Sequence, residues 1–138
     1  MPEENVEVVR RVYEATARRD SDAVLALYDP EVEWDVSQDP TMVPMVGAGV
    51  YRGQDGLRRF FREWYEAWEN IRNEPEELID ASDDSVVVVV TDRAQGRASG
   101  AEVARTHAAL WTVRDGKVVR VAWFPTRDAA LEAAGLSE

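Results

Sequence analysis

Apolar residues in the first half of the chain recur every three or four positions, which is typical of helices. This period predicts a first helix over residues 3–19 and a second, shorter one that Ser21 caps and Asp29-Pro30 ends. Alternation over residues 31–37 predicts a strand. The longest apolar stripe predicts a third helix that opens at Gln54. Its members are Leu57, Phe60, Phe61, Trp64 and Trp68.

From residue 71 onward the period falls to two, which is typical of strands. The predicted strands span residues 71–80, 85–95, 102–114 and 117–124, and a capped helix over residues 126–135 follows. Residues 38–49 contain two prolines and two glycines and predict a loop. Helices followed by an antiparallel meander predict an α+β fold with the helices over one face of the sheet.

Asp115-Gly116 predicts a two-residue hairpin turn, because both positions of such a turn need positive φ. Counting back from this turn pairs Arg114 with Lys117. On one face, Trp111 then lies opposite Arg120 and His107 opposite Phe124, while Trp123 falls on the outer face. The only histidine of the chain therefore shares a predicted face with an arginine and two aromatic residues.

Five consecutive valines, residues 86–90, interrupt the alternation that a strand with one wet face should show. Both faces of this strand are therefore predicted to be buried. The helices cover one face only. We expect a second subunit to cover the other, as a homodimer, although a curved sheet folding on itself is an alternative.

Composition restricts the classes of partner. The chain has 138 residues, of which 45% are hydrophobic, and this length fits a single domain over residues 1–138. Its net charge of -11 repels phosphate backbones and anionic lipid, so neither nucleic-acid nor membrane partners are expected. With no secretory start and no apolar run long enough to span a bilayer, we expect a cytoplasmic protein, and the lack of cysteine is compatible with that compartment.

Three polar residues are candidates for a site. His107 is a candidate general acid or base, because the ordinary histidine pKa near 6.5 suits proton transfer at neutral pH; the alternative is a packed structural residue. Arg93, predicted to lie near His107, is a candidate for binding a carboxylate or stabilising an oxyanion, and an ion pair with Asp35, Asp92 or a helix carboxylate is the alternative. Arg120 is a candidate ligand contact or a surface ion-pair partner.

Large aromatic residues predict an apolar binding pocket. The predicted lining residues are Trp34, Trp64, Trp68, Trp111 and Phe124. For each of them, the alternative is an ordinary place in the core. One histidine without a spaced partner predicts no metal site, and the absence of glycine-rich phosphate motifs predicts no cofactor.

The order of elements and three short segments resemble the nuclear transport factor 2-like superfamily, and within it the SnoaL-like branch. The segments are residues 28–34, 51–53 and 111–117. The resemblance implies a cone-shaped α+β barrel around a deep pocket, usually as a dimer. It also implies a range of functions, since members include ketosteroid isomerases, polyketide cyclases, epoxide hydrolases, dehydratases and proteins that only bind.

Steroid isomerases of this superfamily use a tyrosine on the first helix and a carboxylate base on the first strand. Laid over that pattern, this chain has Val12 and Val36 at those places, with Tyr13 and Asp35 each one residue out of register. That isomerase chemistry is therefore not expected. The cyclases place an acid or a histidine on the last two strands, where this chain has His107.

Three functions remain open. The first is cofactor-free acid/base chemistry, as an isomerase, cyclase or hydrolase, on a small apolar molecule. The second is binding such a molecule without transforming it, and the third is a dimeric association domain whose tryptophans fill its own pocket.

Overall fold

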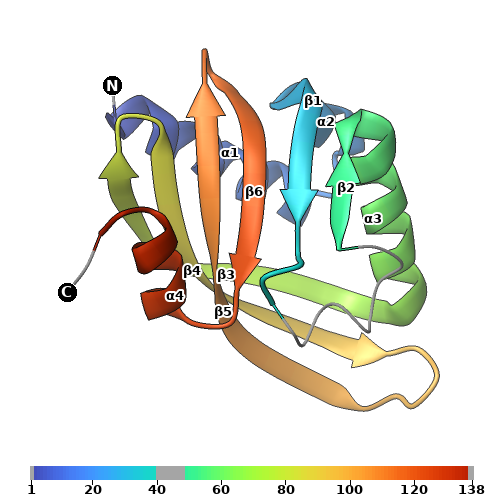
Figure 1. Ribbon diagram of the computed structural model, residues 1–138. Helices are drawn as coiled ribbons and strands as arrows, with labels where there is room; N and C mark the ends of the chain where they lie inside the picture. Colours follow the sequence, from blue (N-terminus) through green and yellow to red (C-terminus); the bar gives the residue numbers. More distant parts are fainter. Residues whose placement is uncertain (1, 40–48, 137–138) are drawn as a thin grey trace.

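The computed structural model describes residues 2–39 and 49–136 (Figure 1). Its elements, in chain order, are α1 (Pro2–Ala17), α2 (Ser21–Ala26), β1 (Tyr28–Asp35), β2 (Val50–Arg52), α3 (Gly53–Ala67), β3 (Trp68–Ser82), β4 (Ser85–Gly96), β5 (Glu102–Arg114), β6 (Lys117–Phe124) and α4 (Arg127–Ala133). The predicted helices and strands are confirmed, and β2 is an addition to them. Most of the loop predicted over residues 38–49 lies outside the described residues.

Local chemistry explains where several elements begin and end. The side chain of Asp20, rather than Ser21, caps α2 by accepting a 3.1 Å hydrogen bond from the Ala23 amide. Thr126 caps α4 in the same way, as predicted. Asp115 and Gly116 both adopt positive φ, at 53° and 75°, which confirms the tight turn between β5 and β6.

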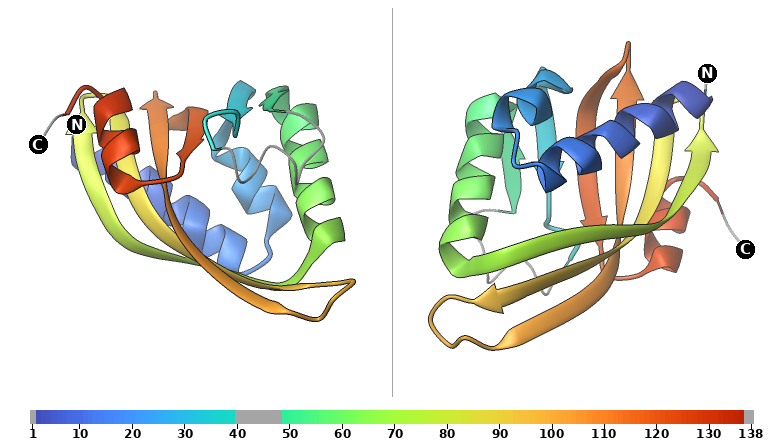
Figure 2. Two further views of the ribbon diagram at one scale, coloured as in Figure 1. Left: turned by 60° about the horizontal axis from the view of Figure 1, so that its bottom comes forward. Right: turned by 180° about the vertical axis from the view of Figure 1, so that it is seen from behind.

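The six strands form one curved sheet in the order β2-β1-β6-β5-β4-β3. Neighbouring strands are antiparallel except for β1 and β6, which run parallel. The predicted barrel is an open sheet, because β2 and β3 form its two edges in the described part of the chain (Figure 2). None of the described helices is long and apolar enough to cross a membrane.

Helices cover both faces of the sheet. The sheet curves around α1, α2 and α3, and the main core forms between them (Figure 2). On the opposite face α4 forms a smaller core, in which Val87 and Leu110 pack with Leu131 (Figure 1). The prediction that both faces of the valine run are buried is confirmed for Val86 to Val88. However, Val87 lies on the second face of the strand and is covered there by α4 of the same chain. It therefore does not need a second subunit to cover it.

A β-bulge in β6 changes the predicted register of the last hairpin. Arg114 pairs with Lys117 as predicted, and Val113 pairs with Val118, but Thr112 pairs with Arg120. One extra residue, Val119, therefore separates the two halves of the pairing. Since successive strand residues point to opposite faces, every residue of β6 beyond the bulge lies on the face opposite to the predicted one.

Candidate functional site

His107 on β5 and Asp92 on β4 form a buried hydrogen-bonded pair. His107 Nε2 lies 2.7 Å from Asp92 Oδ2, and the exposed fractions of the two side chains are 2% and 11%. The other carboxylate oxygen, Asp92 Oδ1, accepts a 2.6 Å hydrogen bond from Asn73 on β3. His107 Nδ1 is buried and has no hydrogen-bond partner in the described part of the chain. Three adjacent strands thus orient the histidine and leave one ring nitrogen unused.

The prediction that Arg93 accompanies His107 is wrong, because it rested on the wrong register between β4 and β5. His107 pairs with Val90, and Arg93 pairs with Ala104 three residues further along. Arg93 therefore has the opposite parity and forms a 2.8 Å ion pair with Glu74. The hydrogen bond and the charge of this glutamate raise the pKa of Arg93.

Asp92 is the site residue that sequence reasoning missed. We considered it only as an alternative partner for Arg93. The signal was present in the valine run, because residues 86, 88 and 90 face the main core and the same alternation carries position 92 to that face. Only the observed register shows that this position lies diagonally across from His107.

Tyr13 on α1 lines the same cavity as His107 and Asp92. Burial raises the pKa of Tyr13 well above its ordinary value, and the negative charge of Asp92 raises it further. Trp111 lowers the pKa of Tyr13, but by less than burial and Asp92 together raise it. Tyr13 therefore remains a protonated hydroxyl that can donate a hydrogen bond. One residue of helical offset does not remove this side chain from the interior, because both Val12 and Tyr13 line the cavity.

Aromatic rings surround the His107–Asp92 pair. Trp34, Trp64, Trp111 and Trp123 all line the cavity. The histidine ring packs against Trp123, with 4.6 Å between the ring centroids. These side chains leave an internal volume of only about 60 Å³, which holds a few water molecules. In this conformation the site is thus largely filled by its own tryptophans.

Trp123, predicted on the outer face, and Trp68, predicted to line the pocket, both lie at other positions than expected. Trp123 was assigned to the outer face, and the bulge in β6 brings it inside. Trp68 opens β3 and contacts Trp64, with 6.1 Å between ring centroids, without lining the cavity itself. Buried indole N–H groups of Trp34 and Trp68 have no hydrogen-bond partner among the described residues.

Arg120 and Phe124 do not face the cavity, which corrects the prediction for both. Arg120 donates hydrogen bonds of 2.9 Å to Glu33 and to Asp35. Asp35 therefore points away from the cavity, as its register predicted. Phe124 packs with α4 in the smaller core. The bulge accounts for both outcomes, because it places the residues of β6 after Val119 on the face opposite to the predicted one.

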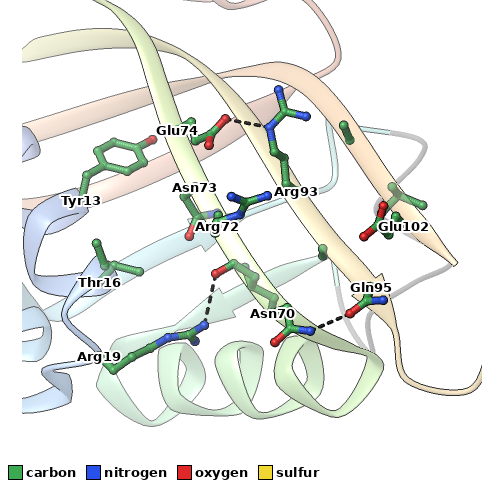
Figure 3. A pocket seen from close by; sticks show the side chains of 15 residues that line it. Tyr13, Thr16, Arg19, Asn70, Arg72, Asn73, Glu74, Arg93, Gln95 and Glu102 are labelled. Atoms are coloured by element: carbon green, nitrogen blue, oxygen red, sulfur yellow. Dashed lines mark hydrogen bonds and ion pairs between the residues drawn. The ribbon is translucent and has the colours of Figure 1, made fainter. Parts of the chain in front are cut away.

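An open polar groove of about 740 Å³ adjoins the cavity. It lies between the end of α1 and strands β3, β4 and β5, and Tyr13 and Asn73 line both spaces. Figure 3 shows the ion pair between Arg93 and Glu74 in this groove, with Arg72 beside it. The described residues contain no group of three or more histidines, cysteines or carboxylates that could hold a metal ion.

Comparisons with known proteins agree with the fold. The SnoaL-like domain model matches residues 9–121. TerC, a protein co-crystallised with polyporic acid, is 26% identical over 96% of this chain and 98% of its own, with a TM-score of 0.78. An NTF2-like protein of unknown function from Burkholderia pseudomallei is 28% identical over 96% of both chains, with a TM-score of 0.79. An NTF2-like protein from Burkholderia thailandensis is 30% identical over 87% of this chain and 88% of its own, with a TM-score of 0.74. The sequence matches no curated protein. The chain belongs to the SnoaL-like family.

Proposed function

We propose that this protein binds a small apolar molecule in the aromatic cavity and moves a proton on it without a cofactor. The observation that carries the proposal is the unused Nδ1 of His107 in a buried site whose other ring nitrogen is held by Asp92. A carboxylate on one ring nitrogen favours the tautomer with its proton there, which leaves the second nitrogen as a base.

Each neighbouring group has a role in this chemistry. His107 Nδ1 accepts a proton from a carbon next to a carbonyl group, and the resulting imidazolium is stabilised by Asp92. Tyr13 donates a hydrogen bond to the carbonyl oxygen as negative charge develops there. Asn73 holds the carboxylate in place. Return of the same proton to a different atom completes an isomerisation. In a cyclisation the carbanion instead attacks a second carbonyl group of the same molecule, and the resulting alkoxide takes the proton back from the His107 imidazolium.

TerC supports a ligand with aromatic character, since that relative was crystallised with polyporic acid. The aromatic lining of this chain provides matching surfaces, because flat rings stack on indole and phenyl groups. A ligand must displace or rotate some of these side chains, since a cavity of about 60 Å³ lies far below the several hundred Å³ typical of ligand pockets.

Isotope exchange tests proton abstraction before the substrate is known. We expect the protein to incorporate deuterium from D₂O into one or more apolar ketones or lactones of a small library, as read by mass spectrometry. His107→Gln and Asp92→Asn should abolish or strongly reduce the incorporation, and Arg10→Gln, a change at a surface ion pair with Glu7, should not. Equal incorporation by the wild type and the His107→Gln variant would remove the catalytic role.

The small cavity supports a second candidate function, in which the protein binds a ligand without transforming it. In that case ligands raise the melting temperature while the isotope experiment stays negative for every one of them. A homodimer remains part of the proposal, although α4 of the same chain already covers part of β4, the strand that suggested it.

A further inference from the structure

A second cleft borders the aromatic cavity on the helical side of the molecule. A cleft of about 390 Å³ lies between the α1–α2 corner and α3. Phe61, Tyr65 and Thr16 line both this cleft and the inner cavity. The rings of Phe61 and Tyr65 stack with 6.2 Å between their centroids. These two half-buried rings of α3 therefore form the partition between the cleft and the cavity.

Three arginines gather in the same cleft, namely Arg19, Arg58 and Arg62. Arg19 lines both this cleft and the polar groove, where it donates a 3.1 Å hydrogen bond to the Ile71 carbonyl, and its guanidinium lies 5.3 Å from the centre of the Tyr65 ring. Neither of these contacts neutralises its charge.

The two arginines on α3 lie one helical turn apart, at positions i and i+4, so their side chains share a face. Arg58 forms an exposed 3.2 Å ion pair with Asp55, a type of contact that contributes little and exchanges readily. Arg62 has no ion pair among the described residues of the chain.

One carboxylate, that of Asp20, lines the cleft as well. It is occupied by the hydrogen bond that caps α2. The lining therefore carries three positive charges and one negative charge, on a chain whose net charge is -11. A local positive site on an acidic protein selects for a small anion that the rest of the surface repels.

We propose that the ligand of this protein is a flat apolar molecule with one carboxylate or similar anionic group. Its apolar body passes Phe61 and Tyr65 into the cavity, and its anionic group stays in the cleft on Arg58 and Arg62. Paired guanidinium donors match the geometry of a carboxylate. The position of the apolar body in the cavity rests on the proposed function. The position of the anionic group rests on the cleft alone.

Two probes with the same ring system but different charge test the site of the anionic group separately from the site of the aromatic body. Titration calorimetry with 2-naphthoate and with its neutral analogue 2-naphthamide should show at least tenfold tighter binding of the carboxylate to the wild type. The Arg58→Gln/Arg62→Gln variant should bind both probes equally. Arg59→Gln is the matched control, because Arg59 lies on the same helix but pairs with Glu63 outside the cleft, and it should keep the preference.

A cavity variant shows where the aromatic body binds. Ala109 lines the inner cavity, so Ala109→Val should weaken both probes to the same extent, with circular dichroism confirming the fold. Equal affinity of the two probes for the wild type would overturn the anionic ligand while leaving the cavity as a binding site. If binding depends on the two arginines but is unchanged by Ala109→Val, the aromatic body does not bind in the inner cavity. If neither probe binds, the whole inference is overturned.

Discussion

At the scale of single residues, the direction of a side chain within its own strand was predictable and its partner across the sheet was not. His107 and Trp111 share one face, as alternation along their strand indicates. Arg93, Arg120 and Phe124 were placed by assuming a register between strands. The observed register differs by one position for Arg120 and Phe124 and by three for Arg93, and any odd shift reverses the face of a residue. For the same reason, Asp92 became a site residue only once its cross-strand position was known.

The buried tyrosine gives a prediction for alkaline pH. The pKa of Tyr13 in the folded state lies above the value near 10 of an unfolded chain, chiefly because of burial. Above pH 10 the unfolded state therefore binds fewer protons than the folded state, and the free energy of unfolding falls as the pH rises. Below pH 10 this contribution stays constant. Tyr28, whose pKa burial also raises, adds to the same effect.

We expect Tyr13→Phe to make this decline shallower. Urea denaturation at pH 8, 10 and 11 measures the free energy of unfolding of both proteins. The difference between the two proteins should shift in favour of the variant as the pH rises. The same slope in both would show that Tyr13 ionises as readily in the folded protein as in the unfolded chain.

At the scale of elements, periodicity predicted the order and type of the helices and strands. It did not predict β2, because three residues are too few to show a period. Nor did it place the boundary between α3 and β3, since Trp68 continues the apolar stripe of the helix although it already has strand geometry. The parallel pairing of β1 with β6 joins segments far apart in the chain, and local patterns contain no information about it.

The terminal helix α4 stabilises the sheet through few but well-buried contacts. Leu131 is 4% exposed and packs in the core that contains Val87 and Leu110. We expect Leu131→Ala to lower the free energy of unfolding by about 2–4 kcal/mol, because it leaves a cavity in that core. Glu132→Gln, at an exposed position of the same helix, should change it by less than about 0.5 kcal/mol. A loss below about 1 kcal/mol for Leu131→Ala in urea denaturation would show that α4 contributes little.

At the scale of the whole molecule, the open sheet was not predicted, and the filled interior was only one of the alternatives that the sequence left open. Closure of a barrel depends on strand curvature, which no single position determines. The free volume of the pocket is the small difference between a large enclosed space and the bulky side chains that fill it. The tryptophans were therefore correctly expected to include pocket-lining residues, but the cavity of about 60 Å³ was not predictable from them.

The homodimer is tested at this scale too. Val89 lies on the outer face of β4 and is only half-buried, so it is the member of the valine run that a second chain would cover. We expect sedimentation equilibrium to give twice the mass of one chain, and Val89→Asp to shift the protein towards the monomer. A wild-type monomer at high micromolar concentration would show that the cover supplied by α4 is sufficient.

The single extra residue in β6 affects how site residues are carried from one member of the family to another. A sequence alignment with a relative that lacks this bulge must either place a gap at Val119 or shift the rest of the strand by one residue. The choice decides whether Arg120 or Val121 is matched to an inward position of a relative. Conservation scores on either side of the gap would then report on opposite faces of the sheet. In this family, the length of the strand after the last turn must be established before its residues are compared.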